Sequence, residues 1–205
     1  GNTVSGHRAR YIIEERIINT KRFNANSVIN TKFGDKIDFT AGASYQFQNN
    51  HYYKQVDDLL GADFYVNVNQ FAERDFQVDN SANQFDLDNP NRILKVGDKF
   101  GYDYNINISR MAGWAQGVFK FNKVDFFLAG TVSQTEFYRK GNTRNGLFPT
   151  DSYGEGTRNK FTNYGGKGGV TYKINGRNYI FANASYQTRS PYFENVYVSP
   201  RTRNA

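Results

Sequence analysis

Residues 22–48 read RFNANSVINTKFGDKIDFTAGASYQFQ, and apolar and polar residues alternate on both sides of the short turn Gly34-Asp35-Lys36. A three-residue loop sets Phe33 opposite Ile37, so the apolar faces of the two segments coincide, whereas a two-residue loop would place them on opposite sides. The sequence therefore predicts an antiparallel hairpin with a three-residue loop. Its predicted apolar face carries Phe23, Ala25, Ile29, Phe33, Ile37, Phe39, Ala41, Ala43, Tyr45 and Phe47.

Two further turn signals predict two more hairpins. At Asn122-Lys123 a two-residue loop joins Phe119 and Phe121 to Val124, Phe126 and Leu128 on one face, and it sets Lys120 opposite Asp125 on the other. Asn175-Gly176 is the strongest type I′ signal in the chain, but both faces of its strands carry aromatic residues, so their faces stay unassigned. The six expected strands are 22–33, 37–48, 103–121, 124–138, 162–174 and 177–188.

The aromatic residues of the first hairpin lie at its ends. Phe33 and Phe39 lie near the turn, Phe23 and Phe47 lie far from it, and alanines occupy the middle. Ten tilted residues climb about 25 Å, the height of an outer-membrane apolar band. The pattern predicts two aromatic girdles of a transmembrane β-barrel, while a soluble sheet is the alternative.

The tight turns alternate with long connections at 49–102, 139–161 and from 189 onward, and we expect a short helix near 54–60 in the first. Short periplasmic turns with long extracellular loops are typical of outer-membrane barrels. The fold class is therefore predicted as all-β, an antiparallel up-and-down transmembrane barrel segment. Six strands cannot close such a barrel, so residues 1–205 are expected to be a fragment of one barrel domain whose plug and remaining strands lie elsewhere.

The composition argues against several other classes. Apolar residues make up 38% of the 205 residues, and 33 of them are Tyr or Phe, so no window offers the ~20 apolar residues of a membrane helix. The net charge of +7 comes from scattered cations, which does not indicate nucleic-acid binding. There is no cysteine, and only His7 and His51 could serve histidine chemistry, so we expect no enzyme, metal site or cofactor.

Several stretches resemble the TonB-dependent outer-membrane receptors of Bacteroidota, which often carry an N-terminal carboxypeptidase-regulatory-like domain. The resemblance covers most of the chain, and its stretches are RFNANS at 22–27, DLLG at 58–61, FAERDF at 71–76, GDKFGYDY at 97–104, DFFLAG at 125–130, RNGLFP at 144–149, the run 165–179, TRSPYF at 188–193 and SPRTRN at 199–204.

The resemblance implies barrel wall and extracellular loops of a receptor that imports a scarce nutrient of the siderophore, glycan or peptide class. It implies a location in the outer membrane of a Gram-negative cell. The implied partners are outer-membrane lipid, the plug and remaining strands of the same protein, TonB and a surface lipoprotein, without nucleic acid. The alternatives are a passive porin, an adhesin or a soluble glycan-binding β-domain.

The best candidate ligand surface combines aromatic rings with an arginine guanidinium group in and beside the first long connection. Its residues are Tyr52, Tyr53, Phe64, Tyr65, Phe71 and Arg74. The alternative is that they pack the loop against its neighbours. The glycine-rich run 165–169 resembles a phosphate-binding loop, but no helix pattern follows it, so glycines of a strand beside bulky neighbours are the better interpretation.

Overall fold

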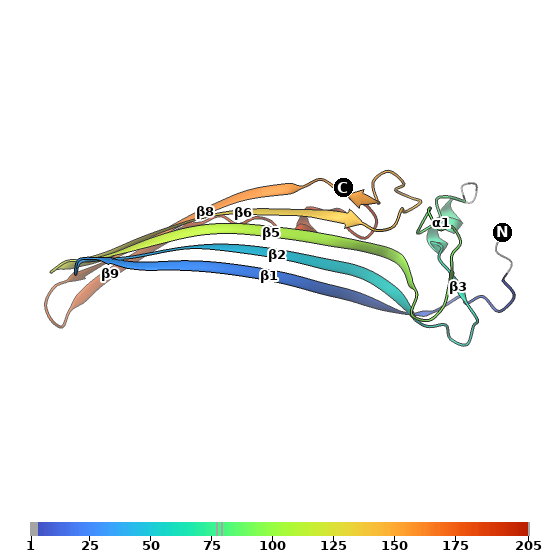
Figure 1. The fold of residues 1–205 in the computed structure, drawn as a ribbon, viewed down its shortest axis with the longest axis horizontal. Helices are drawn as coiled ribbons and strands as arrows, with labels where there is room; N and C mark the ends of the chain where they lie inside the picture. The colour runs from blue at the N-terminus through green and yellow to red at the C-terminus, as the bar shows by residue number, and fades with distance from the viewer. Residues whose placement is uncertain (1–3, 77, 79, 205) are drawn as a thin grey trace.

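The protein is one long, curved antiparallel sheet with small loop structures at one end. The computed structural model describes residues 4–76, 78 and 80–204. The six long strands are β1 (Ile13–Phe33), β2 (Ile37–Asp58), β5 (Lys99–Lys120), β6 (Val124–Gly141), β8 (Asn159–Lys173) and β9 (Tyr179–Gln187). They lie side by side in chain order, and β1 and β9 form the two open edges (Figure 1). The prediction of an all-β, up-and-down antiparallel sheet is confirmed, and the sheet is not closed.

The three hairpin tips lie at one end of the sheet and the connecting segments at the other (Figure 1). These segments contain β3 (Tyr65–Val66), which pairs with β4 (Ile93–Leu94), and the short helix α1 (Gln70–Asp75). They also contain β7 (Gly154–Glu155), which pairs with β6, and the 3-10 turn η1 (Phe193–Asn195). Asn69 begins α1 because its side chain accepts the backbone N–H groups of Phe71 and Ala72.

The register of the first two hairpins is as predicted. Phe33 pairs with Ile37 and Phe23 with Phe47 across the three-residue loop. Lys120 pairs with Asp125 across the two-residue loop. Each register brings the apolar sets of neighbouring strands onto one face, which is why the sequence pattern suffices to define it.

The prediction for the third hairpin was wrong by one residue. The N–H of Ile174 donates to the carbonyl of Asn178 at 3.0 Å, so the loop is the three residues 175–177, and Gly176 lacks the positive φ that a type I′ turn requires. The cause is the Asn175 side chain, whose Oδ1 accepts the N–H groups of Arg177 and Asn178 at 3.0 and 2.9 Å. This Asx-type turn replaces the two-residue turn.

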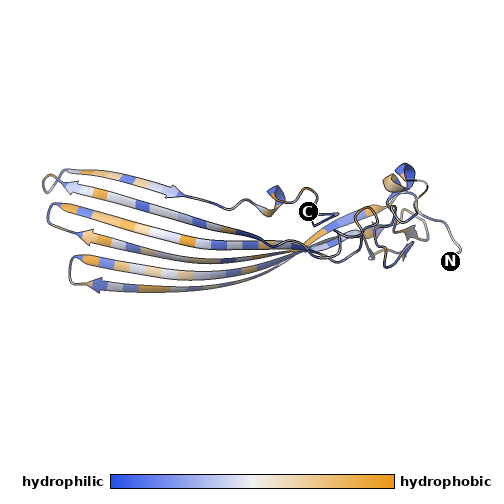
Figure 2. Cartoon of the chain, turned by 90° about the horizontal axis from the view of Figure 1, so that it is seen from above, coloured by the Kyte–Doolittle hydropathy of each residue, from blue (hydrophilic) through white to orange (hydrophobic). Residues whose placement is uncertain are grey.

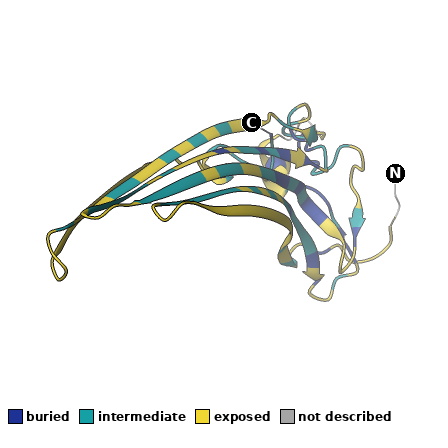
Figure 3. Ribbon diagram, turned by 60° about the vertical axis from the view of Figure 1, so that its left-hand side comes forward, coloured by how far each residue is buried: buried dark blue, intermediate teal, exposed yellow. Residues whose placement is uncertain are grey.

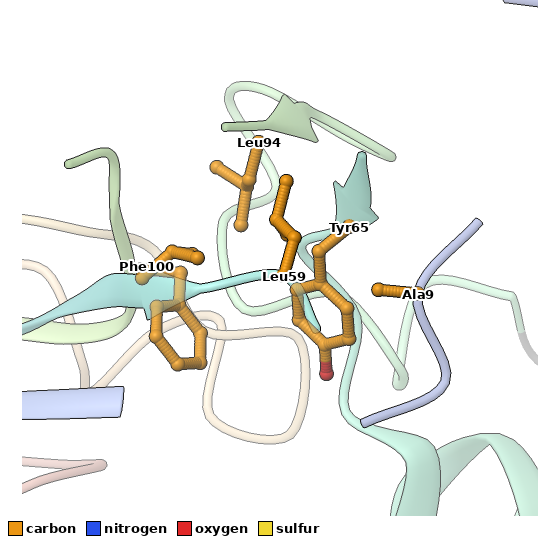
Figure 4. Close-up of a cluster of buried hydrophobic side chains, with 6 residues drawn as sticks. Ala9, Leu59, Tyr65, Leu94 and Phe100 are labelled. Atoms are coloured by element: carbon orange, nitrogen blue, oxygen red, sulfur yellow. The ribbon is translucent and has the colours of Figure 1, made fainter. Parts of the chain in front are cut away.

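Five of the six long strands are longer than predicted, β9 is shorter than the expected 177–188, and the helix expected at 54–60 is wrong. β2 continues to Asp58 because its far end is hydrogen-bonded on both sides, with Gln55 paired to Glu15 of β1 and to Lys99 of β5. The connections shorten accordingly to 59–98 and 142–158. Val56 and Leu59 are buried, together with Ala9, Tyr65, Leu94 and Phe100, in a small core beside the sheet end (Figure 4).

The two faces of the sheet differ in exposure. On β2 the side chains of Ala43, Tyr45 and Phe47 are exposed, whereas Ser44 and Gln46 between them are half-buried. The sheet is curved like a trough, and apolar and polar residues alternate along its strands (Figures 2 and 3). We call the face of Tyr45 and Phe47 the convex face and that of Ser44 and Gln46 the concave face.

A second core lies on the concave face at the end far from the tips. It contains Tyr104, Ile106, Phe137 and Tyr197, and the C-terminal segment supplies Tyr197 and the neighbouring Phe193. The Phe137 ring packs 5.5 Å from Phe161 and 6.3 Å from Tyr197, measured between ring centroids. This core fastens the C-terminal segment to the sheet.

Replacing Phe137 by alanine should lower the free energy of unfolding by about 3–5 kcal/mol, because the side chain is only 2% exposed and its removal leaves a cavity. Urea unfolding followed by circular dichroism measures this change. Phe71→Ala is the control, because Phe71 is 73% exposed on α1. Equal unfolding midpoints for the two variants would contradict the assignment of Phe137 to a core.

Candidate functional site

The convex face carries a band without any charged side chain in the half of the sheet next to the tips. On β1 it runs from Phe33 to Phe23, and Lys21 follows it. On β6 it ends at Gln134 before Glu136, and on β8 it ends at Thr162 before Lys160. The band is exposed, since Phe23, Ile29 and Leu128 each expose more than half of their surface. We call this surface the apolar band.

The aromatic residues of the apolar band lie at its two margins. Phe33, Phe39, Phe119, Phe126 and Tyr172 are near the tips, and Phe23, Tyr45, Phe47, Tyr164 and Tyr186 are at the far margin. Contacts across strands join some of them: the rings of Phe119 and Phe126 stack at 4.5 Å, and those of Tyr164 and Tyr186 lie 6.2 Å apart. Between the margins, alanine, glycine and aliphatic residues predominate.

The register also assigns the faces of the third hairpin, which the sequence left open. Val132 pairs with Tyr164, and Gly166 pairs with Tyr186, so both tyrosines lie on the convex face. Val170 and Ala182 share that face near the tip, while Lys167, Asn183 and Gln187 lie on the concave face. The apolar band therefore continues across all six long strands.

The three tips are staggered in a regular way. Ile37 beside the first tip pairs with Phe119, and β5 continues two residues further before Phe121 pairs with Val124 at the second tip. Val124 pairs with Tyr172, and two residues later Ile174 closes the third tip. From one tip to the next, the sheet edge advances two residues, or about 6.6 Å along the strands, while it crosses two strand spacings, or about 9.6 Å. The three tips share one level if the strands tilt by about 35°, the tilt of closed barrels.

Ion pairs on the concave face connect neighbouring strands beside the tips. Lys120 donates to Asp38 of β2 at 2.5 Å, and Lys173 donates to Asp125 of β6 at 2.7 Å. Lys120 thus binds a carboxylate on the preceding strand, although its backbone partner is Asp125 as the sequence predicts. Because Asp38 lies diagonally across from Lys120, a long lysine side chain can reach it.

At the far end of the concave face, Arg139 holds the C-terminal segment. The residue is 2% exposed. Its guanidinium donates to the carbonyls of Pro200 and Ser152 at 2.5 and 2.9 Å and to Oδ1 of Asn204 at 2.5 Å. It lies 5.0 Å from the centre of the Tyr104 ring, and burial lowers its pKa to about 10. A cation with this many acceptors fastens three chain segments at one point.

Beyond the apolar band, the convex face becomes polar. The Asn49 side chain donates to Asn107 at 2.7 Å, and Nε2 of His51 lies 2.7 Å from Oδ1 of Asp103. Burial alone would raise the pKa of Asp103, but hydrogen bonds from Asn142 and His51 outweigh it and hold the pKa below its usual value. His51 therefore belongs to a polar network just past the band, at the strand-to-loop boundary where the sequence places it.

The six candidate ligand residues do not form one site. Tyr52 lies on the concave face, stacked on Tyr104 at 5.0 Å, whereas Tyr53 lies on the convex face beside His51 at 4.7 Å. Phe64 and Tyr65 are buried, and Tyr65 belongs to the core of Figure 4.

The remaining two candidates are together on α1. Phe71 is exposed, and the Arg74 guanidinium lies 6.0 Å from its ring and pairs with Asp75. The structure thus brings Phe71 and Arg74 together on α1, and the buried Tyr65 lies against the same helix through Gln70.

Sequence reasoning missed Arg139 and Trp114. Arg139 is one of 26 scattered Lys and Arg residues, and the sequence around it does not indicate that its side chain is buried. Trp114 is the only tryptophan and lies in a strand with period-two alternation, so its placement on the concave face could have been inferred from the second hairpin's register. The glycine run 165–169 lies in β8, as expected, and a side chain at Gly169 would collide with Phe127.

Other chemistry finds little support among the described residues. In residues 4–76, 78 and 80–204 no group of three or more His, Asp or Glu side chains could hold a metal ion. No helix in this part of the chain is long and apolar enough to cross a membrane. No family model, curated protein or solved structure matches the chain.

The Asp103 network should make local stability depend on pH. A carboxyl whose pKa is lowered on folding contributes stability above its unfolded pKa of ~3.9, and the contribution is lost as pH falls through the lower folded value. Asp103→Asn should therefore reduce amide protection of residues 49–53 roughly tenfold at pH 6 and remove the decline below pH ~4. Hydrogen exchange corrected for intrinsic rates measures both effects. Asp35→Asn at the first tip is the control, and an unchanged acid profile in Asp103→Asn would refute the assignment.

Proposed function

We propose that this chain forms part of the wall and outer loops of a TonB-dependent β-barrel receptor in the outer membrane of a Gram-negative cell. The observation that carries the proposal is the apolar band on the convex face. It is charge-free, exposed and bordered by aromatic residues at both margins, as expected of a barrel surface that faces lipid. A soluble sheet would leave this large apolar surface in water.

The dimensions of the band support the same proposal. Phe33 to Phe23 spans ten residues, which at a tilt of about 35–40° rises about 25 Å, the height of an outer-membrane apolar region. β9 ends at the far margin of the band, whereas β1, β2 and β5 are 21 or 22 residues long, so about half of each extends beyond the band. That half carries polar residues on the convex face and the loop structures, which suits an extracellular position, and the short turns would face the periplasm.

The membrane assignment can be tested by cysteine substitution along β2, since the chain has no cysteine of its own. Single cysteines at 41, 43 and 45 should react poorly with a water-soluble maleimide in native outer membranes, because their side chains would face lipid. Cysteines at 44 and 46, on the concave face, should react more readily, and position 57, which is exposed at the far end of β2, serves as the reactive control. Uniform labelling of positions 41, 43, 44, 45 and 46 would contradict a lipid-facing band.

The TonB-dependent class can be separated from a passive porin or adhesin in intact cells. Deleting the gene for this protein and deleting TonB should abolish growth on the same limiting nutrient, because energised import needs both. Growth measured across a panel of sole nutrient sources provides the comparison, with a strain lacking an unrelated porin as the control. Growth that depends on this protein but persists without TonB would be compatible with a barrel and would overturn the TonB-dependent assignment.

A further inference from the structure

A hollow of about 620 Å³ lies on the concave face of β2, β5, β6, β8 and β9. It is distinct from the apolar band, which lies on the opposite side of the same strands. Its lining includes the side chains of Thr40, Trp114, Gln116, Thr131, Lys167 and Gln187. They combine one aromatic face, one cation and several hydrogen-bonding groups in one place.

Trp114 lies against the backbone of the neighbouring strand. A side-chain carbon at Gly42 would lie only 2.8 Å from the indole ring, so glycine at position 42 is what allows the ring to rest against β2. Trp114 keeps 38% of its surface exposed. An indole held in this way offers a fixed apolar surface on an otherwise polar wall, and it has little conformational freedom to lose on binding a ligand.

Lys167 supplies a positive charge that no carboxylate neutralises. Among the described residues no Asp or Glu oxygen lies within 4 Å of its ammonium group, which lies 5.9 Å from the centre of the Phe127 ring. Lys173, on the same face of the same strand, is by contrast paired with Asp125. Lys167 can therefore bind an anion without first breaking an ion pair.

The surrounding wall has the same sign of charge. Between the ion pairs at the tips and Glu14 at the far end, the charged residues on the concave face of the six long strands are all cations. They are Arg22, Arg110, Lys167 and the buried Arg139, together with Arg16 and Lys54, which both pair with Glu14. The Arg22 side chain bonds Gln48 at 2.9 Å and Arg110 is exposed. A wall with one sign of charge raises the local concentration of anions.

The rest of the lining matches a ligand that is rich in hydroxyl groups. Gln116, Gln187, Thr40 and Thr131 place amides and hydroxyls around the hollow, and these groups can both donate and accept hydrogen bonds. A pyranose ring presents an apolar C–H face to an aromatic ring and hydroxyls at its edge. A purely apolar ligand would leave the polar lining unpaired.

We propose that this hollow binds an acidic saccharide unit, a pyranose that carries a carboxylate or a sulfate. The sugar ring lies against Trp114, the acidic group is bound by Lys167, and the amides and hydroxyls take the ring substituents. The inference rests on the proposed function, because it places the hollow on the inner wall of the receptor, and it narrows the substrate class.

Calorimetry with the complete protein, purified from outer membranes in detergent, tests the proposal. The probes are tetragalacturonate for the carboxylate, a chondroitin sulfate tetrasaccharide for the sulfate, and maltotetraose as the neutral control. At least one acidic probe should bind, more weakly at higher salt, and at least tenfold more tightly than maltotetraose. Binding of neither acidic probe, or equal binding of the neutral one, would overturn the proposal.

Variants then locate the binding. Lys167→Gln should weaken the acidic probe roughly tenfold and Lys167→Arg should restore most of the affinity, because the charge matters more than the shape of the side chain. Trp114→Ala should weaken it more than Trp114→Phe, which keeps an aromatic ring. Lys21→Gln on the convex face is the matched control and should change affinity less than twofold. Equal loss in Lys21→Gln and Lys167→Gln would refute this location.

Labelling of Lys167→Cys in intact cells distinguishes a ligand from another part of the protein in the hollow. A water-soluble maleimide should react with this cysteine, and the bound acidic probe should protect it. A cysteine that is unreactive both with and without the probe would mean that protein fills the hollow, and the proposal would fall. Saccharide binding is measured in detergent, whereas the membrane assignment of the apolar band is tested by labelling on β2. The saccharide proposal can therefore fail while the membrane assignment holds, and the reverse.

Discussion

The structure depends on the period-two alternation of side chains along antiparallel strands whose register is held by short hairpin tips. Because successive side chains point to opposite faces, one slip between β1 and β2 would move Phe39 and Tyr45 among polar neighbours and Asp38 among apolar ones. The same condition applies at every strand pair. The register thus separates a convex face without charge near the tips from a concave face with cations and amides, within a sheet only one layer thick.

The hairpin tips add a second constraint, which concerns direction. Each tip lies two residues beyond the preceding one, so the tips share a level only if the strands are inclined. The aromatic margin far from the tips shifts in the same direction. It lies at Phe23 on β1 and at Tyr186 on β9, and the residues paired across the sheet from Tyr186 lead to Ile29 on β1, six residues nearer the tip than Phe23. Six residues across five strand spacings correspond to about 40°, close to the value from the tips. Loop lengths and aromatic positions are separate features of the sequence, so their agreement supports a common level rather than a coincidence of packing.

The part of the fold that could be predicted from the sequence is the part that alternation determines. The first two registers followed from matching apolar faces. The third did not, because aromatic residues on both faces removed that criterion and the side chain of Asn175 selected a longer loop.

The far strand ends were missed for a different reason. Val56 and Leu59 share the spacing of a helix face, but backbone pairing to β1 and β5 and burial beside Leu94 stabilise an extended chain through Asp58. Such contacts between distant segments leave no local pattern. The same applies to the candidate ligand residues, because proximity along the chain placed Tyr52 and Tyr53 together although they point to opposite faces.

The two ends of the strands are stabilised by different interactions, and this difference bears on function. Near the tips the sheet relies on backbone pairing, on a few ion pairs such as Lys120 with Asp38, and on whatever medium contacts the apolar band. Far from the tips it is supported by its own loops, through the core around Leu94 and through Arg139, which binds the C-terminal segment. A lipid environment would supply the apolar surroundings that the tip half lacks, whereas the far half already contains its own buried residues. Large apolar exposure therefore occurs in the half without loop cover, which is the arrangement that a sheet half inside and half outside a bilayer requires.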